Sequence, residues 1–288
     1  MNKKTPYILL IPIILLGVIF ICGVLNGLIQ SLGYIPAFDL RDITLDYYIE
    51  ILNNPTFLDS LKLSFKISII SSILAVVIGT VLCAILVYTK HTEGKIIQTI
   101  KLAIVIPHTI VALFAISFIS QNGLIARLLF KLGLISSQGD FPLLLHSQSN
   151  IGIILGYLWK EVPFVAYFCL ALMSSINKSL GEASENLGAS RLQSFFYITL
   201  PLTMPAISKA FLIVLTFSFG AYDLPFLLGA TIPKALPVQA HIEYNHPDLL
   251  HRPYAMAMNG LILAITWTMA GIYYLIDNKK KGDTHEKS

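Results

Sequence analysis

The chain has 288 residues, of which 55% are hydrophobic and 12% are charged, and its formal net charge is +4. Soluble domains carry about 25% charged residues because their surface faces water, so this composition excludes an ordinary soluble protein. The cations lie at the ends of apolar runs rather than in one basic patch, which argues against nucleic acid as a partner. We therefore expect a protein whose main solvent is the lipid bilayer.

Six apolar segments are long enough to cross the hydrocarbon core, which takes about 20 residues in an α-helix. In chain order they are Tyr7–Leu32, Leu61–Tyr88, Ile100–Ser120, Ile151–Ile176, Leu202–Gly229 and Tyr254–Ile276. Backbone N–H and C=O groups cannot stay unpaired in lipid, so we expect each segment to be helical. The predicted fold is an all-α, polytopic bundle of six transmembrane helices. Prolines inside the segments, Pro107 among them, are expected to kink the helices.

The first apolar segment follows Lys3 and Lys4, as the core of a signal peptide would. It is longer than the ~7–15 residues of such a core and has no clear cleavage site, so we expect an uncleaved span. Residues 1–60 are then this span and a first extracytoplasmic loop, residues 61–276 a five-helix core, and residues 277–288 a cytoplasmic tail.

Charged residues in the connections predict the orientation, because lysine and arginine accumulate on the cytoplasmic side of a membrane. Both termini and every second connection carry most of the lysines, among them Lys90, Lys95, Lys178 and Lys280. The opposite connections carry fewer cations, and the first of them is crowded with acids. The sequence therefore predicts a multi-pass protein of the plasma membrane with both termini in the cytoplasm.

Two of the outer loops are long enough to hold structure of their own. Asn122–Gly133 has apolar residues at helical spacing, which predicts a short amphipathic helix at the outer interface. The stretch Ala230–Pro253 is rich in proline, histidine and acids, and it is the best candidate for an external docking loop.

The cysteines and histidines do not have the spacing of a metal site or a disulfide framework. All three cysteines lie in apolar runs, where we expect buried small hydrophobic residues: Cys22, Cys83 and Cys169. His108 has no spaced partner, and the histidines of the last outer loop are five residues apart. We therefore expect no metal site.

Charged residues also lie inside the fourth and fifth predicted spans. Lys160 and Glu161 are in the fourth span, and Asp223, next to Tyr222, is in the fifth. Each ionised group in hydrocarbon costs at least about 2.5–3.5 kcal/mol, so these side chains should face the bundle interior or a water-filled path. Two interpretations stay open: they line the translocation path, or they form a buried clamp in which Lys160 pairs with Asp223 or Glu161.

The connection between the fourth and fifth spans, residues 178–201, has unusually clear local signals. Ser179 and Glu182 form an S-x-x-E capping box, which predicts a helix over Leu180–Leu187. Gly188 suits the left-handed position that ends a helix.

Further along the same connection, Ser190 and Gln193 repeat the capping-box pattern and predict a second short helix. Pro201 is expected to mark the turn into the fifth span. Two capped helices held between membrane helices suit a rigid lever for a soluble motor, but they also suit a plain interfacial connector. The local signals leave both interpretations open.

The same residues resemble a known signature. The order Glu182-Ala183-Ser184, three residues, Gly188, nine residues, Ile198-Thr199-Leu200-Pro201 is similar to the EAA-x3-G-x9-I-x-L-P motif. That motif belongs to permeases of binding-protein-dependent ATP-binding-cassette importers, and serine in place of the third small residue is the one departure. The resemblance extends over residues 61–276 and implies a type I importer permease core preceded by one extra span.

The resemblance implies partners and roles. It implies that the connection is a coupling helix seated on an ATPase subunit dimer, with these residues at or near the contact: Glu182, Ala183, Ser184, Gly188, Leu200 and Pro201. It also implies a second permease subunit and an extracytoplasmic solute-binding protein. Phe219–Gly229 and the following outer loop resemble the subgroup serving polyamine, sulfate, thiamine, ferric-iron and phosphonate uptake. These solutes have opposite charges, so the resemblance does not choose among them, and a small, polyamine-like solute is one candidate cargo.

Several chemical motifs are missing from the sequence. It has no G-x-x-x-x-G-K-[ST] phosphate loop, so we expect ATP to be bound by a separate subunit and no cofactor by this chain. It has no H-E-x-x-H, no G-x-S-x-G and no paired-carboxylate site, so we expect no catalytic residues and no enzyme. The rival interpretation of the six spans is a secondary transporter driven by an ion gradient.

Overall fold

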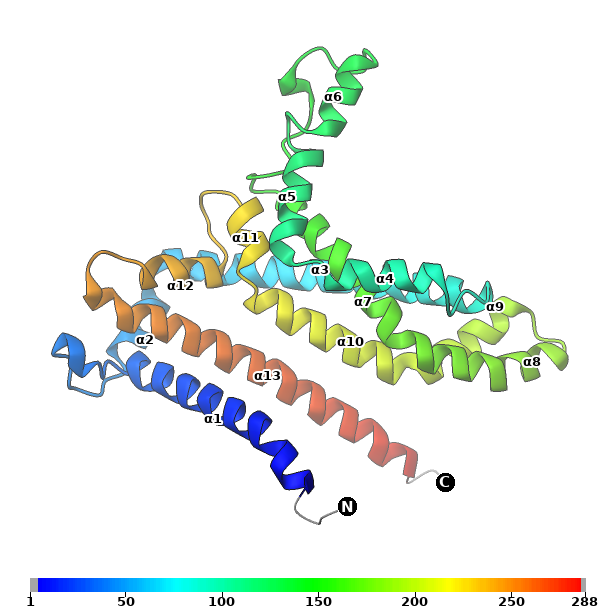
Figure 1. The fold of residues 1–288 in the computed structure, drawn as a ribbon, viewed down its shortest axis with the longest axis horizontal. Coiled ribbons are helices and arrows are strands. Elements are labelled where there is room, and N and C mark those ends of the chain that lie inside the picture. The colour runs from blue at the N-terminus through cyan, green and yellow to red at the C-terminus, as the bar shows by residue number, and fades with distance from the viewer. Residues whose placement is uncertain (1–4, 286–288) are drawn as a thin grey trace. The chain divides into compact units, whose positions relative to one another are not determined.

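The structure is a computed structural model that describes residues 5–285, with side chains over 10–276. It consists of helices joined by turns and loops, with no strand among the described residues (Figure 1). Six stretches of the described chain are long and apolar enough to cross a membrane: Leu10–Ser31, Pro55–Tyr88, His108–Lys131, Ile151–Asn186, Arg191–Gly220 and Leu249–Ile276. The all-α fold with six spans is confirmed.

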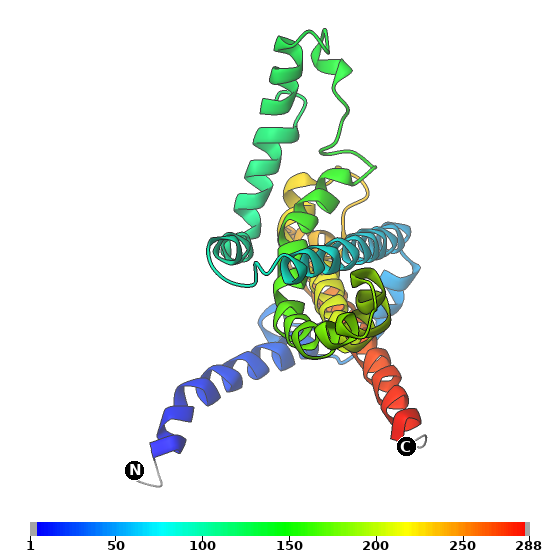
Figure 2. The same cartoon turned by 90° about the vertical axis from the view of Figure 1, so that its right-hand side faces the viewer.

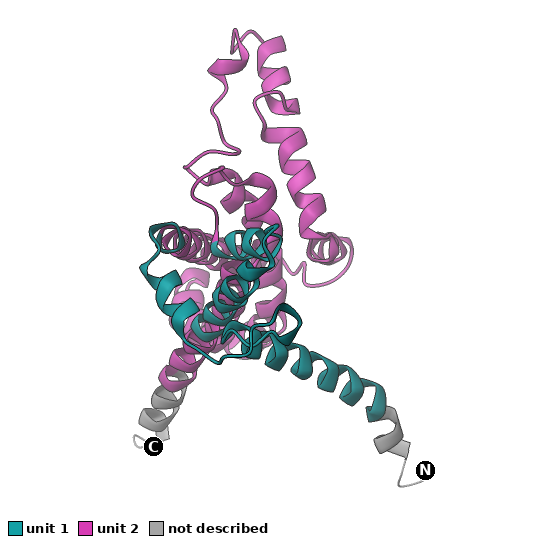
Figure 3. Ribbon diagram, turned by 90° about the vertical axis from the view of Figure 1, so that its left-hand side faces the viewer, with its two compact units in different colours: residues 1–58, 236–265 teal, residues 59–235, 266–288 magenta. Residues whose placement is uncertain are grey.

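The chain forms two compact units, each built from two stretches of sequence (Figure 3). One unit holds residues 1–58 and 236–265, and the other holds residues 59–235 and 266–288. The predicted division at residues 60 and 61 stays a prediction. The backbone of the predicted tail is helical as far as His285, whereas its lysine side chains, like Lys3 and Lys4, lie outside the described residues.

The first unit is organised around a short helix that binds two long ones. Its elements are α1 (Thr5–Ser31), η1 (Pro36–Phe38), α2 (Asp46–Asn53), α12 (Leu236–Tyr244), η5 (Leu249–His251) and the start of α13 (Arg252–His285). Ser31 of α1 shares a hydrogen bond of 2.7 Å with the hydroxyl of Tyr48 in α2. Tyr254 of α13 donates a hydrogen bond to Glu50 of α2. Helix α2 therefore ties the end of α1 to the beginning of α13.

The apolar side chains of α1 from Leu10 to Leu25 are largely exposed in the isolated chain. Cys22 belongs to this exposed set, so the prediction that it is buried is wrong, because α1 does not bury this part of its length against the described chain. Cys83 and Cys169 are fully buried and unpaired, as predicted.

The second unit packs around helix α7. Its elements are α3 (Pro55–Tyr88), α4 (Lys95–Val105), α5 (His108–Ile119), α6 (Leu124–Lys131), η2 (Gln138–Asp140), α7 (Ile151–Ile176), η3 (Asn177–Gly181), α8 (Glu182–Asn186), α9 (Arg191–Ser194), η4 (Phe195–Thr199), α10 (Leu200–Gly220) and α11 (Asp223–Leu228). Helix α7 contacts α10, α4 and α5. Helix α5 also contacts α11, and α6 lies beyond α5, away from the helices around α7 (Figure 2). The largest buried cluster lies among α3, α4, α7 and α10 and includes Cys83, Cys169 and Met173.

Helix α3 approaches α7 closely at Gly79. A Cβ atom on this glycine would lie 2.7 Å from Val165 Cβ and 2.9 Å from the carbonyl oxygen of Val162. Small residues let membrane helices approach each other so that backbone and side chains pack tightly, which is the main driving force for association in lipid. Gly79 is therefore required by the packing of the second unit.

The predicted third span is wrong in its bounds. The sequence predicted one helix over Ile100–Ser120, but α4 ends at Val105 and α5 begins at His108, with extended backbone at Ile106 and Pro107. Proline has no N–H and disfavours helical backbone in the residue before it. The span is therefore interrupted at Ile106 and Pro107, where the sequence predicted only a kink. Helix α6 confirms the predicted helix in Asn122–Gly133, and its place at the membrane interface stays a prediction.

The predicted fifth span is also interrupted. The sequence predicted one helix over Leu202–Gly229, but α10 ends at Gly220 and α11 begins at Asp223, with extended backbone at Ala221. In a continuous helix Ala221 would accept a hydrogen bond from the residue four positions later, which is Pro225 and has no N–H. Both interruptions thus occur where a proline removes a donor.

A turn in the loop after α6 gives a pH-dependent prediction. The amides of Ser136 and Ser137 each donate to Asp140 Oδ2 at 2.8 Å, and these hydrogen bonds hold the pKa of the Asp140 carboxyl below its ordinary value of 3.8. Because the carboxylate is the acceptor, the turn is stabilised above about pH 4 and loses this stabilisation as the pH falls through the lowered pKa. Titrating the Ser136 and Ser137 amide resonances by NMR should show this transition. Asp140→Asn should abolish it, and an unchanged titration in that variant would contradict the assignment.

Candidate functional site

The connection between α7 and α10 is a helical tip built as an extension of both helices. Helix α7 runs through the wider turn η3 into α8, and α9 runs through the wider turn η4 into α10 (Figure 1). The two stretches are candidate spans over Ile151–Asn186 and Arg191–Gly220, so each is a continuous helical rod. The predicted pair of short helices exists, but as the ends of long helices rather than as separate elements.

The first predicted capping box is wrong. Ser179 Oγ donates to the carbonyl oxygen of Ser175 at 2.9 Å, so it bonds back into the helix instead of capping a new one. A capping box needs an amide at a helix start, and in a helix that continues through Ser179 there is no free amide to accept from.

The turn at the end of the tip is confirmed. Gly188 has a φ of +99°, in the range that favours glycine, and its amide donates to the carbonyl of Glu185 at 3.0 Å. The second capping box is present: the Gln193 amide donates to Ser190 Oγ at 3.3 Å, and the Ser190 amide donates to Gln193 Oε1 at 2.9 Å. The chain therefore reverses direction within a few residues.

Pro201 does not mark a turn, which corrects the prediction. The amide of Leu200 donates to the carbonyl of Phe195, five residues back, and this wider turn lets the helix continue through the first turn of α10. Leu200 packs against the buried cluster of α3, α4, α7 and α10. Two of the motif residues therefore lie outside the tip. Leu200 is partly buried against the core, and Pro201 lies in α10, away from the reversal at Gly188.

Hydrogen bonds make the tip rigid. Ser184 and Ser194 both donate to the carbonyl of Gly181, at 2.7 Å and 3.2 Å, which joins α8 to α9. A Cβ on Gly181 would lie 2.8 Å from Asn177 Oδ1, so a larger residue there would disturb this junction.

The surface of the tip combines the motif residues with exposed apolar side chains. Glu182, Ala183 and Gly188 are exposed, and Ser184 is half-buried. Leu187 is 89% exposed, and the other large apolar side chains of this surface are Leu192, Phe196 and Tyr197. Sequence reasoning missed these side chains, although a leucine directly before the helix-ending glycine was a signal that could have found Leu187.

Lys160 lies at the break between α4 and α5. Its Nζ donates to the carbonyl oxygens of Ala103 at 3.3 Å and Ile104 at 2.5 Å, and also to that of Ile106. An ammonium group has three N–H donors, so all of them have a partner here. Among the described residues Lys160 forms no ion pair with Glu161 or Asp223, so the pairing considered from the sequence is not formed.

Glu161 lies on the neighbouring side of α7 and contacts α10. Ser218 Oγ donates to Glu161 Oε1, and the hydroxyl of Tyr157, one turn earlier on α7, donates to the Ser218 carbonyl at 3.3 Å. These three side chains are buried. They connect α7 to α10 two residues before α10 ends at Gly220.

Tyr222 and Asp223 lie at the break between α10 and α11. Asp223 is exposed, and the ring of Tyr222 stacks on that of Phe226 with centroids 4.8 Å apart. His108, the first residue of α5, stacks against Phe217 of α10 and interacts electrostatically with both Lys160 and Asp223. Because α5 also contacts α11, the two helix breaks and these charged residues lie near one another in the second unit.

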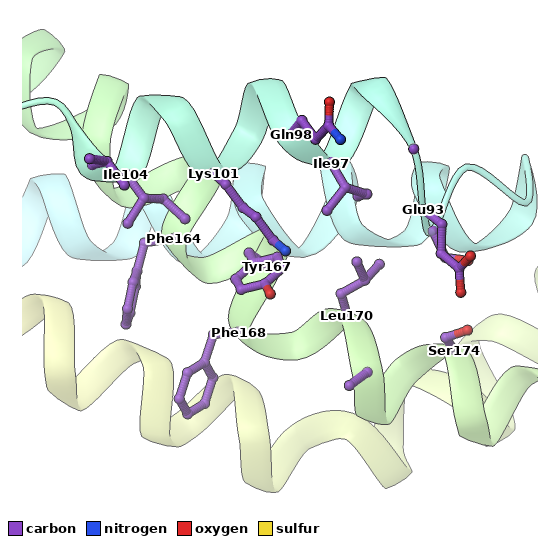
Figure 4. Close-up of a pocket in the computed structure, with 14 residues that line it drawn as sticks. Glu93, Ile97, Gln98, Lys101, Ile104, Phe164, Tyr167, Phe168, Leu170 and Ser174 are labelled. Carbon is purple, nitrogen blue, oxygen red and sulfur yellow. The ribbon is translucent and has the colours of Figure 1, made fainter.

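A groove of about 1120 Å³ lies between α4 and α7 (Figure 4). Its walls carry Ile97, Phe164 and Phe168 together with Lys101, whose Nζ lies 5.1 Å from the centroid of the Tyr167 ring. Sequence reasoning did not find this groove, because it depends on how two distant segments pack.

The sequence matches, over residues 5–282, the family described as "Binding-protein-dependent transport system inner membrane component". The chain belongs to this family. It is thus a multi-pass membrane permease of a transport system and not an enzyme.

Similar proteins agree with this assignment. The permease is 26% identical over 288 residues to the probable ABC transporter permease protein YurN of Bacillus subtilis (strain 168), covering 93% of this chain and 94% of that protein. It is 26% identical over 232 residues to the spermidine/putrescine transport system permease protein PotB of Escherichia coli (strain K12), covering 78% and 82%.

One solved structure shows the same fold. The permease aligns with a chain in the crystal structure of a bacterial alginate ABC transporter in complex with alginate pentasaccharide-bound periplasmic protein, with a TM-score of 0.75 and 20% identity. The alignment covers 94% of this chain and 93% of that chain. The type I importer permease fold expected from the motif is therefore the fold observed.

Proposed function

We propose that this permease forms the solute path of an importer driven by ATP and couples that path to a separate ATPase dimer through the tip between α7 and α10. The observation that carries the proposal is the tip itself, a rigid reversal with Leu187 89% exposed beside the exposed motif residues Glu182, Ala183 and Gly188. A large apolar side chain at the end of a rigid rod is typical of a residue that fits a partner's pocket.

The orientation follows from the same assignment. The lysine-rich connections and both termini lie in the cytoplasm, where the ATPase subunits bind, and the loop Ala230–Pro253 lies outside, where a solute-binding protein docks. Each ATPase of a dimer takes one tip, so a second permease subunit, of the same or a sister sequence, completes the transporter.

For the solute we propose a small cationic amine, of the polyamine type. The support is the α10–α11 break, where an exposed Asp223 carboxylate lies beside the stacked rings of Tyr222 and Phe226. Carboxylates and aromatic faces together bind ammonium groups. Lys160 and Glu161 border this path from α7. Lys160 Nζ donates to backbone carbonyls and Glu161 Oε1 accepts from Ser218, whereas Glu161 Oε2 is buried with no hydrogen-bond partner among the described residues.

Replacing Leu187 by aspartate tests the coupling role. Losing the burial of one leucine and desolvating a carboxylate should weaken ATPase binding at least about tenfold. Co-purification of the cognate ATPase from membranes measures this binding, and ATP-dependent uptake of radiolabelled spermidine into vesicles, with the binding protein supplied, measures transport. Both should be lost.

The matched control is Leu134→Asp, since Leu134 is also strongly exposed but lies in the loop after α6. This variant should keep the ATPase. Uptake that persists in Leu187→Asp, or that follows a proton gradient without ATP, would overturn the coupling role and favour a secondary transporter.

A further inference from the structure

Lys160 satisfies backbone groups that the α4–α5 break leaves without partners. In a continuous helix the carbonyl of Ala103 would accept from residue 107, which is a proline without an N–H. The carbonyls of Ile104 and Ile106 lose their helical partners because the backbone is extended at Ile106 and Pro107. These are the three carbonyls to which Lys160 Nζ donates. The lysine thus stabilises the broken shape of this span.

The next residue of α7 reaches the other interrupted helix. Glu161 accepts from Ser218, and Tyr157 donates to the Ser218 backbone, so α7 holds the last turn of α10 immediately before its break at Ala221. Adjacent residues of one helix therefore hold both breaks, each from a different face.

The same helix leads to the ATPase-facing tip. From Ile151 to Asn186 the chain is helical, so Lys160, Glu161 and the motif residues at 182–184 lie on one rod. A helix held by packing can transmit displacement along its length. Helix α7 packs on α10 and α4 and continues through Pro163, which removes one of its backbone hydrogen bonds.

We infer that Lys160 and Glu161 are positioning residues through which movement of the tip is transmitted to the two helix breaks that border the solute path. The inference rests on the proposed function for its direction of transmission. That Lys160 and Glu161 stabilise the two helix breaks does not depend on the ATPase, and it can be tested on this chain alone. Neither residue has to touch the solute.

The first test measures amide hydrogen exchange over residues 103–112 of the full chain in lipid nanodiscs. Lys160→Met removes the three donors, so exchange there should rise about tenfold, since hydrogen bonds to a charged group contribute about that factor or more. Lys160→Arg should restore protection. Lys101→Met, which removes a lysine from the same α4–α7 contact away from the break, should leave it unchanged. Equal exchange in Lys160→Met and wild type would overturn the inference.

Pro107→Ala provides a test that can be read even if Lys160→Met alone folds poorly. Alanine returns an N–H that can donate to the Ala103 carbonyl, so the break should need Lys160 less. The double variant Lys160→Met with Pro107→Ala should regain exchange protection, or folded yield if Lys160→Met alone does not fold. No rescue in either readout would overturn the role of Lys160 at the break.

The second test uses the transporter assembled with its ATPase. Spin labels on exposed Leu113 of α5 and Val77 of α3, in a background without the native cysteines, report the distance between these helices. ATP with vanadate should change this distance in wild type but not in Lys160→Met, although the ATPase stays bound. A normal change in Lys160→Met would overturn transmission. If wild type binds no ATPase, the proposed function fails, and the exchange experiment still decides the role of Lys160.

Discussion

Gly79→Leu is expected to prevent the second unit from packing. The new side chain would begin 2.7 Å from Val165 Cβ and 2.9 Å from the Val162 carbonyl oxygen. A backbone oxygen cannot rotate away as a side-chain tip can, so α3 and α7 would have to separate. Overpacking typically costs about 1–3 kcal/mol, and this contact involves backbone, so we expect at least about 3 kcal/mol. The measurement is thermal unfolding of the detergent-solubilised chain, together with its folded yield.

Gly17→Leu is the control for that experiment. Gly17 lies on α1, where nothing is within 4 Å of an added Cβ. The same change of residue type should therefore alter stability by no more than about 0.5 kcal/mol. A similar loss in both variants would show that leucine is harmful for a reason other than the α3–α7 contact.

Gly188→Val should uncouple the permease while leaving its core intact. At a φ of +99° a side chain is strained, although the space around Gly188 is open. Left-handed backbone costs an ordinary residue about 1–2 kcal/mol, and a β-branched residue more, so valine should distort the reversal at the tip. We expect co-purification of the ATPase and ATP-dependent uptake to fall by about tenfold or more, with an unchanged unfolding temperature.

The variant Gly188→Asn distinguishes two effects of Gly188→Val: strain of the left-handed backbone, and the mere presence of a side chain at this position. Asn tolerates left-handed backbone better than any branched residue, so Gly188→Asn should retain most of the ATPase binding. If valine and asparagine are equally harmful, the tip needs a bare backbone against its partner rather than the left-handed turn. If both are harmless, the turn has no part in coupling.

The two capping boxes show how far local sequence predicts structure. Both pairs, Ser179 with Glu182 and Ser190 with Gln193, have the same spacing, but only the second forms. The second follows Gly188, which has already ended the preceding helix, so a new helix needs a cap. Nothing ends the helix before Ser179, and α7 continues through it. A capping-box pattern therefore predicts a new helix only where a residue such as glycine has already ended the preceding one.

The interrupted spans show the other limit. Apolar runs predicted that six helices cross the membrane, and the prolines inside them predicted kinks. Pro107 and Pro225 accompany a break, whereas Pro12, Pro163 and Pro205 lie inside uninterrupted helices. Whether a proline bends or breaks a helix depends on what satisfies the freed carbonyls, and that group comes from elsewhere. Lys160 lies more than fifty residues from Ile106, so only the packing of α7 on α4 reveals it. The groove between these helices was hidden for the same reason.

The hydrogen bonds between Lys160 and the α4–α5 break also constrain how this sequence can evolve. A chain that loses the lysine first is left with three unpaired carbonyls in an apolar unit, and one that loses the proline first is left with a lysine that has fewer acceptors. Either single step is harmful, whereas the double change is mild. Positions 107 and 160 are therefore expected to covary among related sequences.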